Sequence, residues 1–121
     1  MLTSAIPMLV SLNEDETVKF YTEKLGFIFH SSWEGYLIFS RDGVFIHLWP
    51  HHDANIAQNT GCYVNVTGVE SLYKEYKAWG LIHPNGGDLE EKPWQMKQFS
   101  ILDNNGNIIH FGESTAGEDD D

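Results

Sequence analysis

Two histidines stand at matching places in the two halves of the chain, and the chemistry they first suggest is metal binding. His47 lies four residues after Gly43, and His110 lies four residues after Gly106. Imidazole binds transition metals well, but a stable protein site needs about three or four ligands. Two imidazoles alone are too few, so these residues predict no bound metal and no cofactor.

The other residues that could do chemistry give weaker signals. His51 and His52 are adjacent, so in an extended loop their side chains point apart, and no nearby cysteine completes a metal site. Cys62 is the single cysteine, which excludes an intrachain disulfide, and its place in a strand predicts a small buried hydrophobic residue. The chain has no nucleophile elbow, phosphate-binding loop, dinucleotide motif or C-x-x-C pair, so no covalent catalysis is indicated.

Aromatic residues gather on one face of the predicted strands. Along 44–49 the aliphatic residues alternate with aromatic ones and a histidine, so the two sets point to opposite faces of the sheet. An aromatic face must be covered by the other half of the chain, by a second subunit or by a flat ligand, and the sequence leaves all three open. The residues assigned to this face are Phe45, His47, Trp49, Tyr63 and His110.

The elements that position these residues repeat in the two halves. Asn13 is the predicted cap of the first helix with Glu16 at its third position, and an Asp42-Gly43 turn predicts the first hairpin. In the second half, Thr67 and Glu70 form a predicted capping box. The first half reads as a strand at 5–11, a helix from Asn13 to Gly26, a strand at 27–29 and hairpin strands at 36–40 and 44–49. The second half reads as a strand at 62–66, a helix ending at Gly80, an expected strand near 81–83 and hairpin strands at 98–102 and 108–111.

Each half is therefore a predicted βαβββ module, and the modules form one α+β domain over residues 1–121. Module one spans about 3–50, module two about 61–113, and 114–121 is an acidic tail. A polar linker at 50–60 joins the modules, and the long loop at 84–95 is a candidate functional loop. The apolar stripe predicted for the second helix consists of Val69, Leu72, Tyr73, Tyr76 and Trp79.

The chain is acidic, with a net charge of −11. Four of the 18 acidic residues lie at 118–121, and the remaining 14 still outnumber the 7 basic ones. Such a field repels nucleic acid and membrane phosphates and attracts cationic ligands, although solubility alone also explains it. No apolar run approaches the about 20 residues that cross a bilayer, and the first residues do not resemble a signal peptide, so we expect a cytoplasmic protein.

Three segments resemble bleomycin-resistance proteins of the glyoxalase/dioxygenase (vicinal oxygen chelate) superfamily. They are 2–7 (LTSAIP), 20–27 (FYTEKLGF) and 92–107 (KPWQMKQFSILDNNGN). The resemblance implies two βαβββ modules that form a curved mixed sheet with a crevice, completed in a homodimer whose first strand is often exchanged. Metal-dependent members place ligands at positions that match Ile6, His47, Gly61 and His110, and only the two histidines can coordinate.

The resemblance implies non-enzymatic sequestration of a bleomycin-type glycopeptide antibiotic or a similar cationic planar ligand. The alternatives are a metal-dependent lyase, isomerase or dioxygenase, which would add ligands such as Glu113, and a binding module for another planar amphiphile. We expect a homodimer that binds neither nucleic acid nor membrane. The expected ligand-binding residues are Trp33, Tyr36, His47, Trp49, Tyr63, Trp94 and His110.

Overall fold

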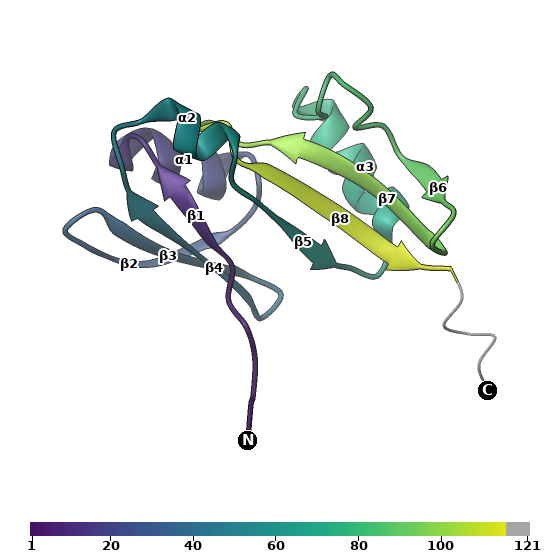
Figure 1. Cartoon of the computed structure of the whole chain (residues 1–121), viewed down its shortest axis with the longest axis horizontal. Coiled ribbons are helices and arrows are strands. Elements are labelled where there is room, and N and C mark those ends of the chain that lie inside the picture. The colour runs from purple at the N-terminus through teal and green to yellow at the C-terminus, as the bar shows by residue number, and fades with distance from the viewer. Residues whose placement is uncertain (116–121) are drawn as a thin grey trace. The chain divides into compact units, whose positions relative to one another are not determined.

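The computed structural model describes residues 1–115, which form two compact units (Figure 1). The first unit contains residues 1–60 and the turn 104–107, and the second contains 61–103 and the chain from 108 onward. The acidic tail predicted for 114–121 begins too early, because Ser114 is the last residue of a strand, and residues 116–121 lie outside the described part of the chain. No helix among the described residues is long and apolar enough to span a bilayer.

The first unit is a four-stranded mixed sheet with a helix on one face. The strands lie in the order β1-β4-β3-β2, with β1 parallel to β4 and the other pairs antiparallel. Asp42 and Gly43 both have positive φ, as the predicted hairpin turn requires. The elements are β1 (Met8–Ser11), α1 (Glu14–Glu23), β2 (Ile28–Trp33), β3 (Tyr36–Arg41), β4 (Val44–Pro50) and α2 (Ala54–Gln58). The short helix α2 lies inside the segment that the sequence predicts as a linker.

The second unit repeats this arrangement. Its strands lie in the order β5-β8-β7-β6, again with the first and last strands of the module parallel. The elements are β5 (Gly61–Asn65), α3 (Val69–Ala78), β6 (Glu90–Lys92), β7 (Met96–Leu102) and β8 (Ile108–Ser114). Each unit is therefore strand, helix and three strands, which confirms the predicted α+β class with paired βαβββ modules.

The strand expected near 81–83 is wrong. That segment makes a single bridge between Ile82 and Ile101, and the fourth strand of the sheet is β6, within the predicted long loop. Pro84 has no amide hydrogen to continue a ladder, so the pairing stops after one residue. The chain then turns and returns to the sheet edge at Glu90.

The two longer helices, α1 and α3, begin differently. Asn13 caps α1 as predicted, and its side chain accepts a hydrogen bond from the Glu16 amide at 2.9 Å. The predicted Thr67–Glu70 capping box is wrong, because Gly68 occupies the N-cap in the left-handed conformation and makes no side-chain cap. The Glu113 carboxylate of β8 supplies the missing acceptor, at 3.1 Å from the Val69 amide nitrogen.

The core of each unit lies between its helix and its sheet. In β4 the residues Ile46 and Leu48 are fully buried, as alternation predicts, and Tyr76 is the buried centre of the stripe on α3. Trp79 departs from the predicted stripe: it follows the last helical residue and is 54% exposed. The fully buried side chains of the first unit include Leu9, Val10, Tyr21, Leu25, Leu37, Phe39, Ile46 and Leu48, and those of the second include Tyr76, Ile101 and Ile109.

The turn at 104–107 belongs to the first unit because its asparagines bind the outer edge of β1. The Asn107 side chain accepts from the Val10 amide at 3.1 Å and donates to the Val10 carbonyl at 2.8 Å. Asn105 Oδ1 accepts from the Leu12 amide at 2.9 Å. These side chains pair the backbone groups of a sheet edge that would otherwise be unmatched.

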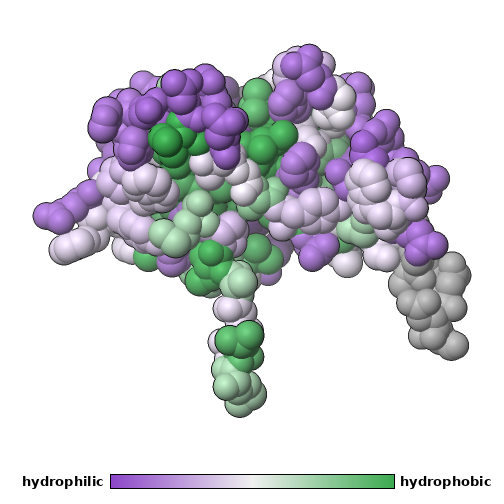
Figure 2. Space-filling model, in the orientation of Figure 1, coloured by the Kyte–Doolittle hydropathy of each residue, from purple (hydrophilic) through white to green (hydrophobic). Residues whose placement is uncertain are grey.

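The chain before β1 is exposed and hydrophobic. Met1, Leu2 and Ile6 are exposed large apolar residues, and Figure 2 shows hydrophobic side chains along this N-terminal segment. An apolar segment without intramolecular cover is a candidate contact for another molecule.

Candidate functional site

The outer face of the first sheet carries the residues that alternation predicts. Phe45, His47 and Trp49 alternate with the buried residues of β4. The Tyr36 hydroxyl and His47 Nδ1 form a hydrogen bond at 2.9 Å, with the rings edge to face at 5.5 Å between centroids. Tyr36 and His47 are therefore brought together, on neighbouring strands of one sheet.

Trp33 lies at the end of β2, opposite Tyr36 in the strand register, and is 75% exposed. Trp49 contacts a different partner. Its ring meets His51 edge to face at 5.0 Å between centroids. The four ligand residues expected in the first unit therefore form a Tyr36–His47 pair, an exposed Trp33 beside it in the hairpin and a separate Trp49–His51 contact.

The expectation that His51 and His52 point apart is wrong. Their rings stack at 4.8 Å between centroids with an angle of 6° between planes. The segment is not extended, because His51 Nδ1 accepts a hydrogen bond from the Asp53 amide at 3.0 Å as the chain turns into α2.

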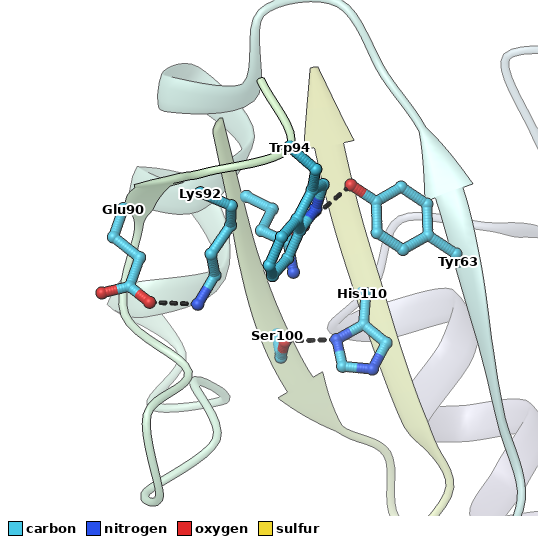
Figure 3. A network of polar contacts seen from close by, with 7 residues as sticks. Tyr63, Glu90, Lys92, Trp94, Ser100 and His110 are labelled. Carbon is cyan, nitrogen blue, oxygen red and sulfur yellow. Dashed lines mark hydrogen bonds and ion pairs between the residues drawn. The ribbon is translucent and has the colours of Figure 1, made fainter. Parts of the chain in front are cut away.

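In the second unit, Gln98 joins two of the expected ligand residues. Its Oε1 atom accepts from the Tyr63 hydroxyl at 2.9 Å and from the Trp94 indole nitrogen at 3.4 Å. Figure 3 shows the Tyr63 and Trp94 rings on the same face of the sheet. The sequence analysis missed Gln98, although its alternation with Phe99 in β7 places it on the outer face.

His110 lies beside this group. The Ser100 hydroxyl and His110 Nδ1 are joined at 2.6 Å, and the His110 ring is 6.1 Å from the Tyr63 ring (Figure 3). Burial lowers the pKa of His110, and the charges of His83 and Lys92 lower it further. His110 therefore tends to be neutral where an ordinary histidine begins to take up a proton.

Tyr63 reaches its position because Gly112 of β8 has no side chain. A Cβ atom on Gly112 would lie 2.0 Å from the Tyr63 hydroxyl oxygen and 2.7 Å from Cζ. Any residue with a Cβ atom at position 112 would occupy the space of the Tyr63 ring. Gly112 is therefore a positioning residue for the site. Its signal in the sequence is a glycine inside a predicted strand.

A cavity of about 130 Å³ opens on the same face of the second sheet. It joins the strand residues around His110 to the loop that follows the Ile82–Ile101 bridge. Its lining is mostly polar, and none of the lining residues is Asp or Glu. The lining residues are His83, Asn85, Gly86, Lys92, Gln98, Phe99, Ser100, Ile108 and His110.

The residues at the superfamily's metal positions do not fit a metal site. Ile6 and Gly61 have no donor atoms, and the place of a side chain at Gly61 is occupied by Ile108, whose Cγ2 would lie 2.4 Å from an added Cβ. Within residues 1–115, no three His, Cys, Asp or Glu side chains are grouped as metal ligands. Glu113, the additional ligand considered for an enzyme, caps α3 instead.

Cys62 is only partly buried, where the sequence predicts a buried residue. Burial raises the pKa of the Cys62 thiol to about 11, with a further contribution from the Asp103 carboxylate. A thiol with such a pKa is protonated at neutral pH and is a poor nucleophile.

Comparison with known proteins identifies the family. The sequence model described as "Glyoxalase superfamily protein" matches residues 1–118. A curated bleomycin resistance protein of Geobacillus stearothermophilus is 28% identical, with 91% of this chain and 96% of the relative covered.

Two solved structures share the fold. A bleomycin resistance determinant encoded on the transposon Tn5 has a TM-score of 0.81 at 22% identity, covering 93% of this chain and 98% of that chain. The bleomycin-binding protein of Streptomyces verticillus, complexed with copper(II)-bleomycin, has a TM-score of 0.80 at 22% identity, covering 92% and 95%. Because the family model spans nearly the whole chain, this protein belongs to the glyoxalase superfamily, as its motifs predict.

Proposed function

We propose that the protein binds and sequesters a bleomycin-type glycopeptide antibiotic or a similar cationic planar ligand. The observation that carries the proposal is the group of Tyr63, Gln98 and Trp94, in which one amide oxygen orients two aromatic rings. The relatives named as bleomycin resistance proteins support it, as do structures of this fold that contain bleomycin.

The exposure of these rings suits a flat ligand. Trp94 is 61% exposed and Tyr63 is 42% exposed, although both are held by hydrogen bonds. Stacking on oriented aromatic rings contributes roughly 1–3 kcal/mol per ring in comparable platforms. The net charge of −11 would attract a cationic ligand over a longer range.

Sequestration requires no chemistry from the protein. The Cys62 thiol is held in its protonated form, and the superfamily's metal positions lack two of four donor side chains. We therefore propose a binding protein rather than an enzyme, acting in the cytoplasm. The proposed ligand-binding residues are Trp33, Tyr36, His47, Trp49, Tyr63, Trp94 and His110.

We also propose that residues 1–121 act as one domain and that the chain forms a homodimer. The match of one family model to 1–118 supports the single domain. The exposed apolar segment before β1 and the exposed Trp33 support a second copy as their cover. Light scattering at micromolar concentration should give about twice the chain mass of 13.8 kDa, and a monomer mass would refute the dimer.

Calorimetry with bleomycin, phleomycin and unrelated aromatic cations tests the function. Trp94→Ala should weaken drug binding about 5- to 150-fold, the equivalent of one lost stacking contact. Trp79→Ala is the matched control, since Trp79 is also exposed but lies at the end of α3. Parent-like binding by Trp94→Ala, with no quenching of parent tryptophan fluorescence, would contradict the proposed site.

A further inference from the structure

The cavity in the second unit is lined by basic side chains and by no acidic ones, although the chain as a whole is acidic. The chain carries 18 acidic and 7 basic residues, yet the cavity lining contains His83, Lys92 and His110 and no carboxylate. The nearest ion pair joins Lys92 to Glu90, which is outside the lining. Three side chains that can carry positive charge therefore meet in one small space.

A hydrogen bond to the loop backbone fixes which ring nitrogen of His83 carries the proton. Its Nδ1 atom accepts a hydrogen bond from the Asn85 amide at 3.0 Å, so the ring proton of the neutral form is on Nε2. The Nε2–H group is therefore the donor that the His83 ring offers as a lining residue of the cavity.

The loop that carries His83 is fastened to β7. The His83 amide donates to the Ser100 carbonyl at 2.8 Å, and the Ser100 amide donates to the Gly87 carbonyl at 2.9 Å. Gly87 also packs on the His83 backbone so closely that an added Cβ would lie 2.6 Å from the His83 carbonyl oxygen. The donor arrangement is therefore preorganised rather than carried by a free loop.

Lys92 on β6 and His110 on β8 complete the set, and β7 lies between these two strands. The Lys92 ammonium lies 5.9 Å from the centre of the Trp94 ring, between Trp94 and Glu90 (Figure 3). The Ser100 hydroxyl and His110 Nδ1 share a hydrogen bond. Burial is the main cause that lowers the pKa of His110, and the nearby His83 and Lys92 lower it further.

We propose that this cavity binds a small oxyanion, a phosphate, sulfate or carboxylate group, through His83, Lys92 and His110. An anion accepts charge-assisted hydrogen bonds from the Lys92 ammonium and from the N–H groups of the two histidine rings. The cavity volume of about 130 Å³ is well above the roughly 30 Å³ that one water occupies in the liquid. The inference does not depend on bleomycin being the ligand.

The test is titration of the full chain with inorganic phosphate at constant ionic strength, with chloride as the balancing anion. Calorimetry and the histidine ring signals in NMR should show saturable binding that involves His83 and His110. Lys92→Gln and His83→Gln should each weaken phosphate binding about tenfold or more, the loss of one charge-assisted hydrogen bond. Lys92→Arg keeps the charge and should retain binding.

Lys74→Gln is the matched control, because it removes one positive charge from α3 outside the cavity. It should bind phosphate within about twofold of the parent. Absence of saturable phosphate binding would overturn the proposal, and so would equal affinities of Lys92→Gln, His83→Gln and Lys74→Gln. Both results are obtained without the drug, so they leave the drug-binding test unaffected.

A second titration distinguishes a free anion from an acidic group on an aromatic ligand. If the cavity binds a free anion, phenyl phosphate should bind with the same affinity as inorganic phosphate. If the oxyanion is part of a planar ligand, phenyl phosphate binds more tightly, and Trp94→Ala removes the difference. Both results require saturable binding of inorganic phosphate, and its absence refutes the oxyanion cavity.

Discussion

Replacing Asn107 with alanine tests how the first unit is held together. Asn107 and Val10 are both fully buried, and their two hydrogen bonds of 3.1 and 2.8 Å pair the outward backbone amide and carbonyl of β1. The change leaves two buried backbone groups unmatched, each costing about 1–3 kcal/mol. We expect Asn107→Ala to lower the free energy of unfolding by about 2–6 kcal/mol, a large part of the about 5–15 kcal/mol typical of a domain.

Urea unfolding followed by circular dichroism measures this effect as a lower midpoint at unchanged slope. Asn59→Ala is the control, because the Asn59 side chain donates one exposed bond of 2.7 Å to the Asn55 carbonyl. Its loss should cost less than about 1 kcal/mol. If Asn107→Ala unfolds within about 1 kcal/mol of the parent, the turn at 104–107 does not secure β1 and the reasoning fails.

Three further predictions follow from individual side chains. Cys62 should react with a disulfide reagent at pH 8 on the order of a hundredfold more slowly in the folded chain than in the urea-unfolded chain. The reason is that burial raises the pKa of the Cys62 thiol from 9.0 to about 11. Equal reaction rates in the two states would contradict this prediction. Because the pKa of His110 is lowered in the folded chain, the unfolded chain binds a proton at this residue at higher pH than the folded chain does. The free energy of unfolding should therefore fall as the pH drops through the ordinary histidine range. Urea titrations at several pH values measure this, and His110→Gln should remove that part of the pH dependence. Gly112→Ala should destabilise the parent but have little effect in a Tyr63→Ala background, which a double-mutant cycle measures; equal effects in both backgrounds would show that the ring does not require the glycine.

The sequence by itself determined the features that depend on local periodicity. Alternation along 44–49 predicted that Phe45, His47 and Trp49 share a face, and the structure confirms it because side chains of a strand point alternately to its two sides. The Asp42-Gly43 turn and the Asn13 cap were also predictable, since both use residues within a few positions of each other. The repeat of these signals was enough to predict two βαβββ modules.

Only the tertiary structure decided which distant groups meet. Glu113 caps α3 from 44 residues away, and Asn107 binds Val10 across 97 residues, so no local pattern could assign either role. The shared acceptor Gln98 depends on Tyr63 reaching it from β5, 35 residues earlier in the chain. The candidate anion cavity likewise lies where a loop meets β6, β7 and β8, because proximity in a sheet is set by strand order and not by sequence separation.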